Sequence, residues 1–244
     1  MDGAARERSA ADKTRKGTLL AKRVQQDAAE ALRRNLATLG YLPDSDSSSP
    51  EIVVYNRRWK STPYLFAIND NRTFGDYVGQ WGLVMEKGLP FEGWASIRDS
   101  EKKVGAVYEL SRGGEVAFSR EGENVKVPVK FDTNDGRMFV FLAKKIGSVA
   151  LDVPLGVECG GEIKVSMTVK DADGRPIEAL LPVEIRLYDA SGREIDGGGW
   201  FCAEGGVACV TFQTNLDDAE GDYRIVCKDR ASGLTATRRI GKCE

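Results

Sequence analysis

Histidine is absent from the 244-residue sequence, and its absence removes several classes of chemistry. Ser-His-Asp triads, cysteine–histidine pairs and imidazole general bases cannot form within this chain. Zinc sites that need imidazole ligands are excluded for the same reason. A reaction carried out by this chain would therefore depend on paired carboxylates, a lysine or cysteine nucleophile, or a metal ion held by oxygen ligands.

Long apolar runs are also missing. No stretch of about 18 apolar residues occurs, so we expect no segment that inserts into a membrane. Residues 1–17 are polar and charged, lack the apolar core of a signal peptide, and are expected to be disordered. The cellular location is left open by these features. The charges nearly balance, with 35 Lys and Arg against 37 Asp and Glu, so we expect no nucleic-acid partner.

Cysteine is confined to the last third of the chain, and no two cysteines form the C-x-x-C pair of zinc ribbons or redox motifs. No glycine-rich phosphate loop occurs either, so we expect no metal and no cofactor. Cys202 and Cys209 flank residues 203–208, a predicted hairpin tip, and would form a disulfide if their Cβ atoms point toward each other. The alternative is that the five cysteines are reduced, small buried residues, and their odd number favours it.

Apolar residues recur at helical spacing over residues 18–40 and predict an amphipathic helix. Thr18 is the expected N-cap and Gly40 the expected C-terminal stop. A lone helix of this length is only marginally stable in water, so we expect its apolar stripe to pack against the following domain, an upstream domain or a partner protein. Residues 41–50, rich in serine and aspartate, are expected to be a linker. The stripe comprises Leu20, Val24, Ala28, Leu32, Leu36 and Leu39.

From Glu51 onward the hydrophobic period changes to two, which is typical of strands. Short β-rich runs separated by turn residues predict one β-sandwich over residues 51–145. A second set of about seven runs over residues 146–244 has the rhythm of an immunoglobulin-like sandwich. The expected fold class is therefore all-β, with two tandem antiparallel β-sandwich domains preceded by one amphipathic α-helix.

Two aspartate-rich segments, residues 132–136 and 171–174, superficially resemble calcium loops. Neither provides the alternating ligands followed by a glycine and a glutamate at the twelfth position. We interpret both as hairpin turns, in which Asp and Asn bond the local backbone and Gly takes positive φ.

The loop over residues 69–90 is dense in amides, carboxylates, aromatic rings and glycines, which is the chemistry of sugar sites. Aromatic faces stack on pyranose C–H groups while polar side chains bond hydroxyls, so a carbohydrate site is one hypothesis. The favoured alternative is a structured loop whose polar groups cap turns. A third hypothesis, a small glycosidase, would use Asp76 and Glu86 as an acid pair about 5–9.5 Å apart. The candidate carbohydrate-binding residues are Trp59, Asn69, Asp70, Arg72, Asp76, Tyr77, Trp81 and Trp94.

One motif consists of Arg58-Trp59 followed by Tyr64 to Asp70. It resembles the opening of the C-terminal β-sandwich domain of bacterial glycoside hydrolases of the β-galactosidase-like type, where a Y-x-F-x-x-N strand follows an arginine. The hairpin series formed by residues 105–110, 125–131 and 136–142 resembles the end of the same domain.

Residues 146–244 resemble a macroglobulin-like or bacterial immunoglobulin-like domain, through the phrases at Val169–Gly192 and Gly221–Gly233. In the glycoside hydrolases the catalytic carboxylates lie upstream, in a barrel, and no position of this chain corresponds to them. The resemblance thus implies a non-catalytic accessory or structural pair of domains, the C-terminal part of a larger bacterial carbohydrate-active or cell-surface protein that is exported. The alternatives are the carbohydrate-binding module and the small glycosidase.

Overall fold

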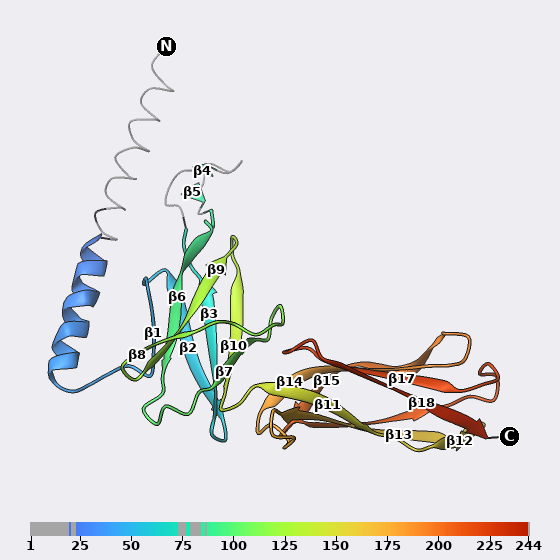
Figure 1. Ribbon diagram of the computed structural model, residues 1–244. Helices are drawn as coiled ribbons and strands as arrows, with labels where there is room; N and C mark the ends of the chain where they lie inside the picture. The colour runs from blue at the N-terminus through green and yellow to red at the C-terminus, as the bar shows by residue number, and fades with distance from the viewer. Residues whose placement is uncertain (1–19, 21–22, 73–76, 79–83, 86, 244) are drawn as a thin grey trace, which may run out of the picture. The chain divides into compact units, whose positions relative to one another are not determined.

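The computed structural model of the protein describes residue 20 and residues 23–72, 77–78, 84–85 and 87–243. Within these ranges the chain forms eighteen strands and one helix that precedes them, so the all-β prediction is confirmed (Figure 1). No helix in this part of the chain is long and apolar enough to cross a membrane.

Backbone contacts group the chain into two compact units. The first comprises Met1–Asn56, Phe66–Ser100 and Ser119–Arg137, and the second Arg57–Leu65, Glu101–Phe118 and Met138–Glu244. The predicted domains at 51–145 and 146–244 remain predictions.

The helix, drawn in blue in Figure 1, covers residue 20 and residues 23–38 of the described chain. Gly40 follows it with φ of 77°, a left-handed conformation that glycine adopts without steric cost. The Gly40 N–H donates to the carbonyl of Ala37 at 3.0 Å, and the Tyr41 N–H donates to that of Leu36 at 2.9 Å. These bonds satisfy carbonyls of the last turn, as expected for a glycine that ends a helix.

Part of the segment expected to be a linker forms a strand. β1 (Ser45–Ser47) pairs antiparallel with β6 (Phe91–Arg98). Ser47 is buried, and its hydroxyl lies within hydrogen-bond distance of the carbonyls of Ser49 and Ile52, at 2.9 and 3.0 Å. These contacts hold a polar tripeptide in a sheet, although its sequence has no hydrophobic period.

The first four-stranded sheet has the order β1-β6-β9-β8, where β9 is Asn124–Phe131 and β8 is Ser119–Glu121. Alternate residues of β9 are buried from Val125 to Phe131, as the period of two predicts. β8 pairs only with residues 124–126 of β9. Pro128, which has no N–H to donate, therefore lies where β9 has become a local edge.

A second four-stranded sheet has the order β2-β3-β10-β7, and its residues are divided between the two units. In β10 the run from Phe139 to Leu142 is buried, as predicted for a strand with apolar residues on both faces. Two short strands, β4 (Tyr77–Val78) and β5 (Val84–Met85), pair separately. The strands of the larger sheet are β2 (Ile52–Trp59), β3 (Thr62–Asn69), β10 (Gly136–Leu142) and β7 (Ala106–Glu109).

The remaining strands all lie in the second unit and form one eight-stranded sheet in the order β11-β13-β16-β15-β14-β17-β18-β12. Its two ends come into contact, since β11 touches β18 and β12 touches β13. The bounds are β11 (Ile146–Asp152), β12 (Gly156–Glu158), β13 (Glu162–Asp171), β14 (Leu180–Tyr188), β15 (Glu194–Glu204), β16 (Val207–Gln213), β17 (Tyr223–Asp229) and β18 (Thr235–Cys243).

The eight-stranded sheet buries one face of each long strand. In β13 and β14 every second residue is buried, from Ile163 to Val169 and from Leu181 to Leu187, which confirms the predicted alternation. One pairing departs from the antiparallel prediction, because β12 runs parallel to β18. β11 pairs with β13, and β12, which follows it after Pro154, pairs with β18 at the other end of the sheet. The chain does not reverse direction between these two strands.

Candidate functional site

Asn69, a predicted sugar ligand at the end of β3, is buried and fully engaged in holding loops together. Its Nδ2 donates to the carbonyl of Leu89 at 2.7 Å and to that of Asp132 at 2.9 Å. Its Oδ1 accepts a hydrogen bond from the N–H of Asn71 at 3.1 Å. The amide therefore joins three segments that are far apart in sequence, which is a structural role.

Asp70 and Arg72 stand next to this amide in the sequence and remain accessible. Their side chains are about half exposed and form an ion pair, with Arg72 Nη2 3.0 Å from Asp70 Oδ2. An exposed pair of this kind contributes little to stability. Both groups thus lie at the surface of the first unit, each already facing an opposite charge.

Trp94 and Trp59, the predicted stacking platforms in the described chain, each carry a lysine over the ring. Lys126 Nζ lies 4.2 Å from the ring centroid of Trp94 and also pairs with Glu121. Lys60 Nζ lies 4.5 Å from the ring centroid of Trp59, which belongs to the second unit. The cation–π contact covers one face of each ring, and both rings are partly buried.

Four further residues of the predicted carbohydrate site and of the predicted acid pair have no described side chain. Asp76, Trp81 and Glu86 are outside the described residues, and Tyr77 is described only by its backbone in β4. The acid pair and the second half of the carbohydrate site therefore remain predictions. In the first unit the structure places Asn69, Asp70, Arg72 and Trp94, whereas Trp59 is in the second.

The predicted hairpin tip at residues 203–208 is confirmed. Gly205 and Gly206 have φ of 62° and 78°, and Glu204 pairs with Val207 across them. Cys202 lies opposite Pro182 on β14, and Cys209 lies opposite Ser166 on β13. Both thiols are free and exposed in the structure, so the disulfide stays a hypothesis about oxidation.

The expectation that the cysteines are buried holds for Cys227 and is wrong for Cys159, Cys202 and Cys209. Burial raises the pKa of Cys227 to about 12. Partial burial, with the charge of Glu204 adding to it, raises the pKa of Cys202. Neither thiol has the lowered pKa of a catalytic nucleophile.

The aspartate-rich segments are turns, as predicted. Gly174 takes the expected positive φ of 78°, whereas at residues 132–136 it is Asn134, with φ of 54°, and not Gly136 that does so. One Asp171 carboxylate oxygen accepts hydrogen bonds from the N–H groups of Asp173 and Arg175, both at 2.9 Å. The Asp135 carboxylate accepts from the N–H groups of Asp132 and Gly136 at 3.1 and 2.9 Å. Their oxygens are therefore used by the local backbone. In the described part of the chain, no three acidic or cysteine side chains gather as a metal site requires.

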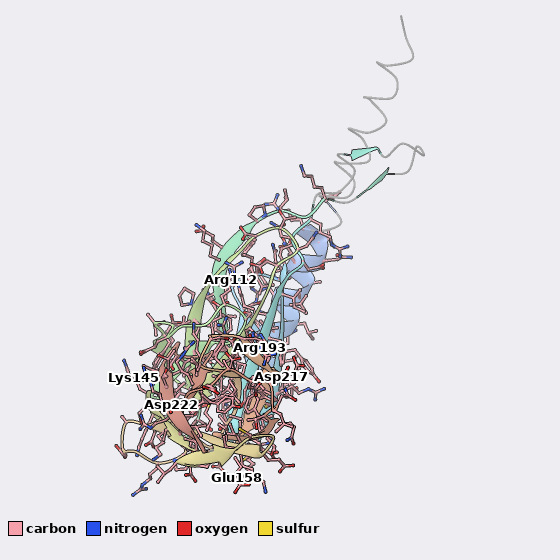
Figure 2. The ribbon with its side chains drawn as sticks, turned by 90° about the vertical axis from the view of Figure 1, so that its right-hand side faces the viewer. Arg112, Lys145, Glu158, Arg193, Asp217 and Asp222 are labelled. Carbon is pink, nitrogen blue, oxygen red and sulfur yellow. The ribbon has the colours of Figure 1, made fainter. Side chains whose placement is uncertain are left out.

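An ionic network with two buried aspartates and a half-exposed arginine stabilises the β14–β15 turn of the second unit. Asp189 accepts bonds from the hydroxyl of Ser191 at 2.6 Å and from Arg193 Nε at 3.2 Å. These bonds, with that of Ser191 contributing most, lower the pKa of Asp189 to about 2. Arg193 also pairs with the buried Asp218, and the nearby Asp217 adds its charge (Figure 2).

The sequence prediction missed an aromatic and charged cluster on the outer face of β14, β15 and β17. Trp200 on β15 is 61% exposed, and the guanidinium of Arg230 lies 4.4 Å from its ring centroid. Glu184 accepts from Arg186 at 2.6 Å and from Arg230 at 3.4 Å. The signal in the sequence was the position of Trp200 in the strand. It is an odd number of residues from the buried Ala203 and Ile195, so in a strand its side chain points to the opposite face.

A hollow of about 240 Å³ in the second unit lies between the β2–β3 turn and the β13–β14 connection. Three of its charged groups are already paired, because Lys144 contacts Asp171 and Asp173 while Glu178 contacts Lys60. We therefore assign no chemistry to it.

No protein-family model matches the chain, and no curated protein matches it. Among solved structures, a β-glycosidase from Bacteroides vulgatus is similar over 79% of this chain and 25% of its own, at 12% identity and a TM-score of 0.32. A putative β-galactosidase from Bacteroides fragilis is similar over 64% of this chain and 33% of its own, at 15% identity and a TM-score of 0.28. The adhesin domain of Epf from Streptococcus pyogenes is similar over 82% and 81%, at 11% identity and a TM-score of 0.29.

The chain spans a quarter to a third of the length of the two Bacteroides proteins. TM-scores of this size carry no argument about function, and membership of a glycoside-hydrolase family stays a prediction.

Proposed function

We propose that this chain is a non-catalytic accessory module that attaches to the catalytic part of a larger carbohydrate-active protein. The attachment is made by the apolar stripe of the N-terminal helix. The carbohydrate-active context comes from the sequence resemblance of residues 51–240, and the attachment comes from the exposure of the helix.

The observation that carries the proposal is the exposure of this stripe. The side chains of Leu20 and Leu39 are 65% and 81% exposed, and Val24 and Leu32 are each 59% exposed. A helix with an uncovered apolar stripe gains little from burial and is marginal in water. The stripe therefore needs a partner surface to contribute to stability.

The polar residues of the predicted sugar site support a structural role for the first unit. Asn69 uses its amide to join loops, and Trp94 is covered on one face by Lys126. Both groups act in cohesion, whereas the apolar stripe of the helix is uncovered.

Site-specific photocrosslinking in the native host tests this proposal. A photoreactive phenylalanine analogue replaces Leu32 in one variant and Glu30 in a matched variant, since Glu30 lies on the opposite side of the helix and pairs with Arg34. We expect residue 32 to crosslink to a carbohydrate-active protein or domain, and residue 30 not to do so. Crosslinks from residue 32 to a second copy of the chain, or equal crosslinking from both positions, would contradict the proposal.

A further inference from the structure

The outer face of the eight-stranded sheet carries an ordered arrangement of aromatic rings and charged side chains. In β14, residues 183, 185 and 187 are buried, so Glu184, Arg186 and Tyr188 point to the opposite face. The strand register aligns these residues with side chains of the neighbouring strands in two cross-strand rows.

The first row is Trp200, Glu184, Lys228 and Thr235, across β15, β14, β17 and β18. The second row is Glu194, Tyr188, Arg224 and Arg239 across the same four strands. Glu184 and Tyr188 are four residues apart on β14, so the rows are separated by about 13 Å at 3.3 Å per residue.

The carboxylates of this face are neutralised. Glu184 pairs with Arg186 and Arg230, and Arg186 also pairs with Glu194 at 2.6 Å. Arg230 lies over the ring of Trp200 and helps to fix its orientation. The ring of Trp200 is thus fixed in orientation and 61% exposed. The carboxylates beside it are already paired with arginines of the same face.

Arg224 and Arg239 are different, because they lie directly opposite each other on β17 and β18. Like charges in a cross-strand pair destabilise a sheet. Both side chains are exposed, and neither has an acidic partner among the residues that the structure describes. Arg224 instead lies over the ring of Tyr188, 4.6 Å from its centroid. An anionic ligand would relieve the repulsion and accept hydrogen bonds from both guanidinium groups.

The remaining chemistry of the face favours a sugar over a protein as the source of that anion. Stable protein interfaces have an apolar core. Here the ring of Trp200 is exposed and that of Tyr188 is half-buried, and charged side chains separate the two, which suits separate ring-by-ring stacking. The face is also a sheet surface, on which an extended ligand can lie flat.

We propose that the outer face of β14, β15, β17 and β18 binds an acidic oligosaccharide. Trp200 stacks on a pyranose ring, and Arg224 and Arg239 bind the carboxylate of a uronic-acid unit in the other row. This site is separate from the helix stripe, and failure of either proposal leaves the other intact.

Isothermal titration calorimetry of the full chain with tetragalacturonate and tetramannuronate at low salt tests the site. The matched ligand is fully methyl-esterified tetragalacturonate, which keeps the rings and removes the charges. The matched variants are Arg239→Gln and Arg238→Gln, since Arg238 is adjacent on β18 but lies opposite the buried Ile225, on the alternate side of the strand.

We expect wild type to bind at least one of the two acidic ligands. Arg224→Gln and Arg239→Gln should each weaken that binding about tenfold, the effect of losing one charge-assisted hydrogen bond. Esterification should have at least the same effect, and Trp200→Ala should weaken binding of both ligand forms. Arg238→Gln should bind as wild type, and Arg239→Gln should not lower the melting temperature because it removes a like-charge contact.

The proposal is overturned if folded wild type binds neither acidic ligand, or if the ester binds as tightly as the acid. Equal losses in Arg238→Gln and Arg239→Gln would overturn it too. Equally tight binding of tetraglutamate, unaffected by Trp200→Ala, would identify a general anion surface in place of a sugar site.

Discussion

The hydroxyl of Tyr64 both donates to the carbonyl of Leu180, at 3.1 Å, and accepts from the Leu180 N–H, at 2.6 Å. One side chain of β3 thus satisfies the two backbone groups at the start of β14, within the second unit. Burial raises the pKa of Tyr64 to about 12, so the phenol stays protonated and able to donate at all physiological pH values.

Replacement of Tyr64 by phenylalanine should lower the free energy of unfolding by about 1–3 kcal/mol, because two backbone groups lose their partner. Urea unfolding followed by circular dichroism measures the change. Tyr41→Phe is the control, since Tyr41 is mostly exposed. Equal stability of the Tyr64 variant and wild type would show that water replaces the hydroxyl.

Asn69→Asp should destabilise the first unit by at least about 2 kcal/mol, because it removes two donors and places a carboxylate against two carbonyls. Hydrogen exchange of the first unit would register the loss. The same substitution at the exposed Asn124 should have little effect. If Asn69→Asp instead left stability unchanged and abolished sugar binding, Asn69 would be a ligand-binding residue and its structural assignment would be wrong.

The pKa of Asp189 predicts a pH dependence of stability. Its folded-state pKa of about 2 lies below the ordinary 3.8, so the carboxylate contributes stability that is complete above about pH 4. That contribution is lost as the pH falls from about 4 through 2. Unfolding free energies measured from pH 5 to pH 2 should therefore decline, and the decline should be shallower in Asp189→Asn.

Asp217→Asn is the control for this measurement, because Asp217 is exposed and its carboxylate accepts none of the bonds that hold the turn. It should keep the wild-type slope. A slope that Asp189→Asn leaves unaltered would mean that another group controls acid stability.

The cysteines should differ in how fast their thiols are alkylated in the folded protein. Iodoacetamide at neutral pH should modify the exposed Cys209 and Cys202 in the folded protein, with Cys202 slower than an ordinary thiol because its pKa is raised. Cys227 is buried, with a pKa of about 12, and should react only after unfolding. Peptide mass spectrometry provides the readout. A nonreduced peptide linking Cys202 to Cys209, lighter by two hydrogens, would establish the disulfide instead.

Much of the fold was predictable because half-buried strands impose a period of two. The alternation in β9, β13 and β14 and the glycine turn at Gly205-Gly206 follow from local sequence. β1 was missed because Ser45–Ser47 is held by contacts with the distant β6 and not by its own hydrophobicity. The parallel β12–β18 pair likewise depends on which edges meet after folding.

The candidate site was less predictable, because composition shows which side chains are present but not what they contact. Asn69 has the chemistry of a sugar ligand, yet three backbone partners occupy it. Trp200 was not predicted as a site residue, because it follows three glycines. The register nevertheless places it beside Glu184 and Arg230. Sequence alone gives neither the strand register that places Trp200 nor the meeting of distant loops that occupies Asn69.

The most direct measurement of the accessory role is a turnover assay of the purified chain. Aryl glycosides covering the common hexoses, pentoses and uronic acids would be incubated with wild type and with Asp76→Asn and Glu86→Gln variants. We predict release no faster than in enzyme-free buffer for all three proteins. Release by wild type that either substitution abolishes would contradict the account and establish a glycosidase.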